Sequence, residues 1–208
     1  MGELQAPTAI QGTAASIFMA AAEEFAAHGF DAAGVDRIAA RASVNKAMIY
    51  YHFQNKRALY IEVLRDMFRA VGARARAIAD GPGTAAEKLD AWIDAVIEEA
   101  ARRPWFPPMM LRELAAGAPR FDPDTFAMMN VVFAAVKDVI EQGQREGVFA
   151  DVDPLMTHLT IMPPILIFFA RARVLASHQE SSGLAAPRQL DDFRRHMRRA
   201  AHQLVARS

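Results

Sequence analysis

The chain contains no cysteine, which excludes disulfide bonds, thiolate metal sites and a cysteine nucleophile. Its 24 Lys and Arg balance 24 Asp and Glu, so any attraction to nucleic acid has to come from a local patch. No basic residue precedes an apolar run at the N-terminus, as it would in a secretory signal. The most apolar run, residues 159–170, is about half of the ~20 residues that a membrane span needs. We therefore expect a cytoplasmic protein.

Enzyme motifs are also missing. The chain has no His-Glu-x-x-His, no Gly-rich phosphate loop, no nucleophile elbow and no constellation of carboxylates. We expect no catalytic residue, no metal site and no cofactor, which argues against an enzyme.

What the chain does have is helical periodicity over nearly its whole length, without the alternation that marks strands. This predicts an all-α fold of about nine helices. Gly81-Pro82-Gly83 is the clearest break, although a helix from residue 56 should bridge both halves. We divide the chain into an N-terminal three-helix domain, residues 1–57, and a C-terminal helical bundle, residues 58–208.

Local signals predict where helices begin and end. Gly29, Gly117 and Gly147 are expected to end helices. The expected starts are Asn45, Asn55, the Thr84–Glu87 capping box, Asp122-Pro123 and Asp153-Pro154.

Residues 35–60 carry the strongest functional signal. From Arg37 to Ile61 there are five Lys or Arg and no Asp or Glu. Two short apolar-periodic helices flank residues 42–45, as in a helix-turn-helix, whose second helix presents its N-terminal side chains to the major groove. Here those side chains are Lys46, Ala47, Met48 and Tyr50, whereas Ile49 and Phe53 fit the core. An ordinary helical hairpin is the alternative.

The side chains of this second helix suit DNA chemistry. Lys46 can contact phosphate or guanine, and the Tyr50 and Tyr51 hydroxyls can donate to phosphate. Ala47 and Met48 offer apolar contact to a thymine methyl.

Lys56 and Arg57 open the next helix, where cations oppose the helix dipole. A DNA phosphate docked on this N-terminus would favour them. The alternative is a solvated surface pair tolerated at small cost.

The registered pattern over residues 14–60 resembles that of the tetracycline-repressor-like (TetR) family of bacterial regulators. The matching positions are Phe25, Gly29, Phe30, Val35, Ile38, Ala39, Ala42, Val44, Lys46, Ile49, Tyr50, Tyr51, His52, Phe53, Lys56 and Leu59. The resemblance implies an N-terminal helix-turn-helix DNA-binding domain, a C-terminal ligand-binding and dimerisation domain, and a homodimer on a palindromic operator, released by a small molecule. The DNA-contacting residues it suggests, together with the motif, are Arg37, Asn45, Lys46, Ala47, Met48, Tyr50, Tyr51, His52 and Lys56.

The chain departs from the family pattern at four positions. Ala33 and Gly34 replace the usual Thr or Ser, which weakens the N-cap of the second helix and removes a hydroxyl that would reach phosphate. Ser43 replaces the common turn glycine, so the turn either needs no positive φ or is strained. Met48 replaces a small or hydroxylated residue and shifts any base contact toward apolar.

The resemblance places an effector site in the C-terminal domain, and the apolar composition suggests a small apolar or amphipathic effector. Candidate lining residues are Trp92, Trp105, Phe106, Met109, Phe126, Met129, Asn130, Phe133, His158 and Met162, with Arg112, Glu113 and Thr160 as further polar anchors. The alternative is that most of these apolar stripes are ordinary core.

The last two long helices are expected to pair with their copies in a homodimer. Ala200 and Ala201 would allow close approach, and Arg194, Arg195, Arg198 and Arg199 would flank the seam; a basic solvated face is the alternative. The sequence thus predicts a ligand-responsive transcriptional repressor with no membrane partner. The alternative function is a helical binding or scaffold module with a weakened DNA reader, supported by the hydroxyls lost at positions 33 and 34.

Overall fold

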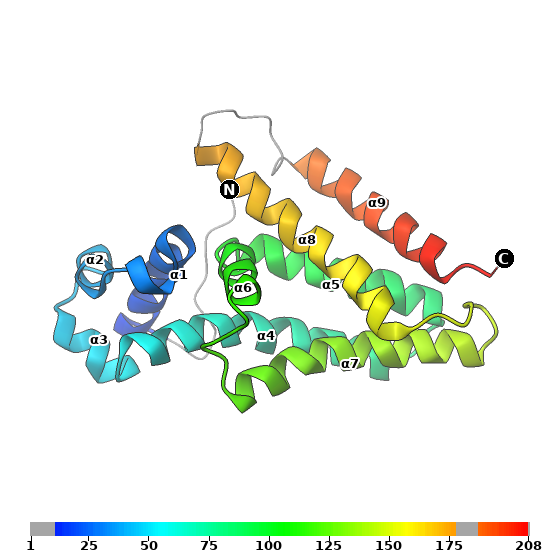
Figure 1. Cartoon of the computed structure of the whole chain (residues 1–208), viewed down its shortest axis with the longest axis horizontal. Coiled ribbons are helices and arrows are strands. Elements are labelled where there is room, and N and C mark those ends of the chain that lie inside the picture. The colour runs from blue at the N-terminus through cyan, green and yellow to red at the C-terminus, as the bar shows by residue number, and fades with distance from the viewer. Residues whose placement is uncertain (1–10, 178–186, 208) are drawn as a thin grey trace. The chain divides into compact units, whose positions relative to one another are not determined.

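A computed structural model describes residues 11–177 and 187–207, and all regular structure in these two ranges is helical (Figure 1). This confirms the predicted all-α class and helix number. The helices are α1 (Thr13–Ala32), α2 (Val35–Arg41), α3 (Lys46–Phe53), α4 (Lys56–Asp80), α5 (Ala85–Arg102), α6 (Phe106–Ala115), α7 (Pro123–Arg145), α8 (Pro154–Ser177) and α9 (Pro187–Val205).

The chain forms two compact units. The first is drawn from Met1–Met67 and Arg102–Phe126, and the second from Phe68–Ala101 and Ala127–Ser208. Helix α4 therefore contributes to both, and α6 belongs with the N-terminal helices. A DNA-binding domain ending at residue 57 stays a prediction, because residues 58–67 and 102–126 also pack in the first unit.

The predicted helix starts are confirmed by their hydrogen bonds. Asn45, Asn55, Asp122 and Asp153 each accept a hydrogen bond from the backbone N–H three residues further on, at 2.8–3.0 Å. Thr84 and Glu87 form the reciprocal capping box, since the Thr84 N–H donates to Glu87 and the Glu87 N–H donates to the Thr84 hydroxyl.

Gly29 interrupts α1 without ending it. Its φ of 73° is the left-handed value expected of a helix-stopping glycine, but helical structure resumes and α1 ends at Ala32. The first regular helical segment therefore stops at Gly29, as predicted, and a short second helical segment follows it across the kink. Gly117 and Gly147 do follow helix ends, with φ of 78° and 71°.

Within the first unit, α1 packs against α2, α3 and α6. The Phe18 ring meets the edge of Trp105 with centroids 6.3 Å apart. The Arg112 guanidinium donates to the carbonyl oxygens of Phe25, Ala26 and Ala27, at 3.4, 2.7 and 3.3 Å. These carbonyls precede the break at Gly29, so Arg112 supplies hydrogen bonds that a helix end otherwise lacks.

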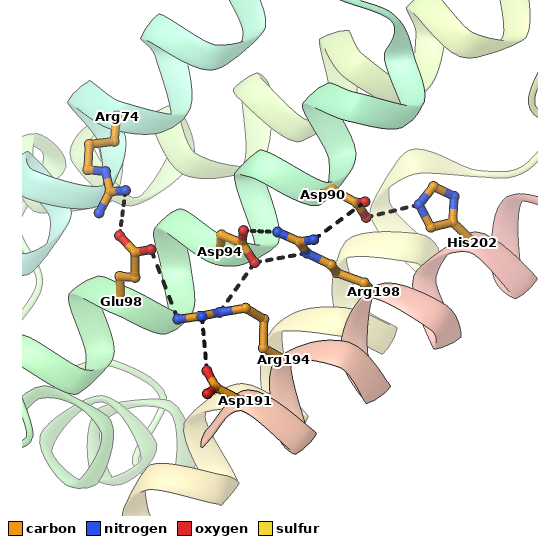
Figure 2. A network of polar contacts seen from close by, with 8 residues as sticks. All are labelled: Arg74, Asp90, Asp94, Glu98, Asp191, Arg194, Arg198 and His202. Carbon is orange, nitrogen blue, oxygen red and sulfur yellow. Dashed lines mark hydrogen bonds and ion pairs between the residues drawn. The ribbon is translucent and has the colours of Figure 1, made fainter. Parts of the chain in front are cut away.

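Within the second unit, an ion-pair ladder joins α9 to α5 (Figure 2). Arg198 Nε lies 3.0 Å from Asp94, and His202 lies 2.9 Å from Asp90. Arg194 lies 3.5 Å from Asp94 and 4.0 Å from Glu98, and Glu98 also accepts from Arg74 of α4 at 2.8 Å. The ladder orients α9 along the acidic face of α5.

This ladder gives two of the four arginines predicted beside the dimer seam a partner within the chain, and the seam itself stays a prediction. Arg194 and Arg198 pair with acids of α5 in their own chain. Ala201 is fully buried within the chain, beside Met197 and Val205 on the same helix face. The charges that complement Arg194 and Arg198 thus come from α5.

Helix α8 continues through Pro163 and Pro164. Over Pro154–Val174 it is, by length and composition alone, apolar enough to cross a membrane, and about a fifth of that stretch (22%) is buried. The estimate that the apolar run was only half the necessary length was therefore wrong, because flanking apolar residues extend it. Core helices of soluble proteins pass the same test.

Candidate nucleic-acid interface and effector region

The turn between α2 and α3 is held by core contacts and one strained residue. Ile49 is fully buried and Phe53 half-buried, which confirms Ile49 as a core anchor of α3. Ser43 has φ of 55°, so the turn does require the positive φ that glycine adopts without cost. The presence of serine leaves the turn strained, the second of the two possibilities at this position.

Helix α3 presents aromatic and basic side chains outward. Tyr50 is 43% exposed and Tyr51 79%, and the first turn of α3 carries no acidic residue. Of the other sequence candidates, Arg37, Asn45, Lys46, Ala47 and His52 are exposed, while Met48 and Lys56 are half-buried. The structure thus leaves the predicted contact residues accessible on or next to one short helix.

Lys46 is engaged by an acid at the start of α2. Its Nζ lies 3.0 Å from the Asp36 carboxylate. The hydrogen bond and charge of Asp36 raise the pKa of Lys46, so the lysine stays cationic. Both side chains are well exposed, and Lys46 can exchange Asp36 for a phosphate at little cost.

A buried carboxylate anchors the N-terminus of α2, where the N-cap residue Gly34 has no side chain to make a cap hydrogen bond. Glu24 of α1, 1% exposed, accepts a hydrogen bond from the Gly34 N–H at 3.1 Å and one from Arg37 Nε at 2.6 Å. Arg37 also donates to the Ala32 carbonyl at 2.6 Å. Burial alone would raise the pKa of Glu24, but the bonds from Gly34 and Arg37 outweigh it and lower that pKa. Sequence reasoning missed Glu24 because its partners lie 10 and 13 residues away.

Lys56 and Arg57 are partly engaged by backbone carbonyls. Lys56 Nζ lies 3.3 Å from the Asp31 carbonyl oxygen and 4.7 Å from the centre of the Phe30 ring. Arg57 reaches the Arg120 carbonyl at 3.5 Å. These contacts hold both cations at the N-terminus of α4, whose first turn carries no acidic residue. Such a site favours an anion.

A groove of about 600 Å³ lies beside the α3–α4 turn. His52 and Arg57 line it, together with Gln54 and Asn55, with Ala14 in the first turn of α1 and with Gln11 just before that helix. Its far wall is formed by Arg65, bound to Asp122 at 2.7 Å. Sequence reasoning gave no sign of this groove, because its walls come from three distant segments.

Four candidate effector residues belong to the first unit, and the fourth, Phe126, is its last residue. Trp105, Phe106 and Met109 are at most 5% exposed in or beside α6. The proposed anchors next to them are already engaged: Arg112 bonds α1, and Glu113 accepts from Tyr60 at 2.8 Å and Arg120 at 3.0 Å. Burial and the Glu113 bond raise the pKa of Tyr60 well above its ordinary value, so it stays a neutral donor. Arg112 and Glu113 therefore stabilise the packing of the first unit.

Candidates in the second unit include one close group of rings. His158 of α8 lies with its ring centroid 5.8 Å from that of Trp92 and 5.4 Å from that of Phe133. Met129 and Met162 are half-buried, and Asn130 is exposed. Phe126, at the end of the first unit, is 41% exposed, and its ring contacts that of Phe121. Trp92, Phe133 and His158 are therefore the members of the predicted set that demonstrably meet.

Among residues 11–177 and 187–207, no group of three or more His, Cys, Asp or Glu is arranged to hold a metal ion.

Comparison with known proteins matches both parts of the chain. A family model described as bacterial regulatory proteins, tetR family, matches residues 17–63, and one described as tetracyclin repressor-like, C-terminal domain, matches residues 86–201.

Curated relatives are transcriptional regulators. The HTH-type transcriptional repressor NicS of Pseudomonas putida is 30% identical over 175 residues, 82% of this chain and 79% of the relative. The HTH-type transcriptional repressor SCO4008 of Streptomyces coelicolor is 30% identical over 145 residues, 69% of this chain and 71% of the relative.

Solved structures show the same fold. The ketosteroid transcriptional regulator KstR2 of Mycobacterium tuberculosis superposes with a TM-score of 0.74 at 22% identity, covering 92% of this chain and 94% of that one.

Proposed function

Because the chain belongs to the TetR family of bacterial transcriptional regulators, we propose that it is a cytoplasmic repressor that binds a palindromic DNA operator as a homodimer and is released by a small apolar or amphipathic effector. Membership makes it a helix-turn-helix DNA-binding regulator. Operator symmetry, the dimer and effector release are the proposed refinements.

The outward face of α3 carries the proposal for DNA reading. Tyr50 and Tyr51 stand exposed on a short helix whose first turn is free of acids. Two tyrosine rings exposed to water are unfavourable unless a partner covers them. Their hydroxyl groups can donate hydrogen bonds to DNA phosphates. We assign base contacts to Lys46, Ala47 and Met48, and backbone contacts to Tyr50, Tyr51 and Lys56. Arg37, Asn45 and His52 lie beside them.

The exposed apolar face of α8 supports the homodimer. Met156, Ile167 and Val174 are 55%, 55% and 56% exposed. Their separations of eleven and seven residues are close to whole helical turns, so they share one side of α8. A row of large apolar side chains on one helix face marks an interaction surface. A second copy of α8, with α9 packed beside it, would cover this row and account for the low burial of so apolar a helix.

Helix α4 supports coupling between effector and operator. It is one continuous helix over Lys56–Asp80, with residues up to Met67 in the first unit and residues from Phe68 in the second. A rigid helix shared by two units transmits a displacement from one to the other. We propose that effector binding in the second unit moves the α4 N-terminus and thereby α3.

The alternative, a helical module with a weakened DNA reader, rested on the hydroxyls missing at Ala33 and Gly34. Glu24 accepts the backbone N–H of Gly34, which anchors the chain at the entry to α2, although it replaces neither the N-cap bond nor the phosphate contact that a hydroxyl would supply. We prefer the repressor, because this anchor holds the start of α2 in place without those hydroxyls.

Fluorescence anisotropy with DNA from upstream of the chain's own gene tests the proposal. Nanomolar binding that is lost in Tyr50→Ala together with Lys46→Ala is expected, whereas equal binding by wild type and variant would overturn the assignment of α3. Sedimentation of Met156→Glu combined with Ile167→Glu tests the dimer. A monomer is expected, and an unchanged dimer would move the interface elsewhere. Circular dichroism confirms folding of both variants.

A further inference from the structure

Two neighbouring rings in the aromatic group of the second unit each carry a buried nitrogen without a hydrogen-bond partner. Trp92 of α5 is 0% exposed, and its indole Nε1 has no hydrogen-bond partner. The Nδ1 atom of His158 is also buried without a partner. The two rings are in edge contact, and Phe133 of α7 packs against the same imidazole.

Such a pair is unusual in a folded protein. Buried donors and acceptors nearly always find a partner, because an unmade hydrogen bond leaves the lost hydration uncompensated. An indole N–H can only donate, whereas a neutral imidazole nitrogen either donates or accepts. Two such atoms in neighbouring side chains indicate that a polar group from outside the chain belongs between them.

The charge state of His158 indicates whether the polar group bound between the two rings is charged or neutral. Burial lowers the pKa of His158 to about 4, so the imidazole is neutral at physiological pH. Trp92 and Phe133 carry no charge. An anion placed here would be desolvated without a cation from these three residues, which is costly. A neutral group avoids that cost.

A single hydroxyl satisfies both atoms. Its oxygen accepts from the indole N–H, and its proton is donated to imidazole Nδ1. Resting on the proposed effector response, we propose that the effector is an uncharged, mainly apolar molecule bearing a hydroxyl group, and that Trp92, Phe133 and His158 form the subsite that holds this hydroxyl. The three rings supply the apolar surroundings for the carbon skeleton next to it.

The test compares matched compounds on the full-length chain. The probes are 4-propylphenol, propylbenzene and 4-propylbenzoate, and a second series of 2-cyclohexylethanol, ethylcyclohexane and cyclohexylpropionate. Binding is followed by calorimetry and by tryptophan fluorescence in Trp105→Phe, which leaves Trp92 as the sole indole because the chain has two tryptophans. The hydroxyl compound of at least one series is expected to bind at least about tenfold more tightly than its two partners, as expected of a buried hydrogen bond.

Variants locate the site. Trp92→Phe and His158→Phe remove one polar atom each and should abolish the preference for the hydroxyl, whereas Trp105→Phe should keep it. Trp105 is a matched control, because its Nε1 is also buried without a partner but lies in the first unit. Circular dichroism and DNA binding show that each variant folds.

Several outcomes would overturn the subsite. One is equal or tighter binding of the carboxylates; another is a hydroxyl preference that survives both variants. Binding by no probe, with His158→Phe more stable than wild type, would mean that the cluster encloses a water only. DNA release by a carboxylate would sink this inference while leaving the proposed repressor intact. Absence of DNA binding without any ligand would instead contradict the proposed function itself.

Discussion

Glu24 holds the start of α2 through Gly34: its buried Oε1 accepts the Gly34 backbone N–H at 3.1 Å. The same oxygen accepts from Arg37 Nε. One carboxylate from α1 therefore both anchors the residue that precedes α2 and orients the arginine of that helix.

Replacing this carboxylate should destabilise the fold. Glu24→Gln keeps the side-chain size but removes the charge, and hydrogen bonds to a charged group are worth about 1.5–3 kcal/mol. We expect the free energy of unfolding in urea to fall by about 1–3 kcal/mol. Glu23→Gln is the matched control, because the Glu23 carboxylate, next to Glu24 in the chain, pairs with Arg41 at the surface. This change should alter the free energy of unfolding by less than about 1 kcal/mol. Equal effects of the two changes would show that Glu24 has no special anchoring role.

Relieving the turn should stabilise the fold. Ser43 adopts φ of 55°, and a glycine there removes strain at the expense of a more flexible unfolded chain. Ser43→Gly is expected to raise the free energy of unfolding by about 0.5–1 kcal/mol. Ala40→Gly, in the exposed helical part of α2, should have the opposite sign, costing about 0.5–1 kcal/mol. A loss of stability in Ser43→Gly would mean that the serine side chain compensates the strain.

Acid should weaken the start of α7. Hydrogen bonds from Thr125, with further help from Arg65, lower the pKa of Asp122 to about 2, from an ordinary 3.8. Because the folded pKa is the lower one, the contribution of Asp122 is complete above the ordinary value and is lost as pH falls toward about 2. Asp122→Asn should therefore be less stable than wild type at pH 5, and the difference should shrink as pH falls to 2. A stability difference between Asp122→Asn and wild type that does not change with pH would mean that packing, not the charge, causes the effect. Asp124→Asn is the control, because the Asp124 side chain is largely exposed.

Removing one phosphate contact should change the salt dependence of DNA binding. Lys56→Ala is expected to weaken binding to all sequences and to lower the slope of log K against log salt by about 1. Lys137→Ala is the control, since this lysine pairs with Glu141 on α7 and should leave the slope unchanged. Anisotropy titrations over a range of salt measure both, and an unaltered slope in Lys56→Ala would remove it from the phosphate contacts.

Local chemistry explains which features could be predicted from the sequence. Caps such as Asn45 and Asn55 act over three residues, so the residues that make the hydrogen bond stand together in the chain. The burial of Ile49 followed from helical period alone. Contacts between distant residues were not accessible in this way. Glu24 meets Arg37 across 13 residues, and Arg112 meets Ala26 across 86.

The α5–α9 ladder could be predicted in part from the sequence. Its acids and bases repeat every four residues on each helix, at Asp90, Asp94 and Glu98 and at Arg194, Arg198 and His202. That spacing indicates two charged faces but not which surfaces meet. Only the structure shows that part of the basic face of α9 pairs with α5 of the same chain.

Selection of operators from a pool of random DNA, performed in parallel with the wild-type chain and Met48→Thr, tests most directly whether α3 reads DNA as one half of a dimer. For wild type we expect a palindromic consensus whose half-sites lie about 10–10.5 base pairs apart, centre to centre, or a multiple of this. Met48→Thr should alter the preferred base at one position of each half-site while changing overall affinity little. A consensus without two-fold symmetry, or one identical for both proteins, would contradict the proposed mode of reading.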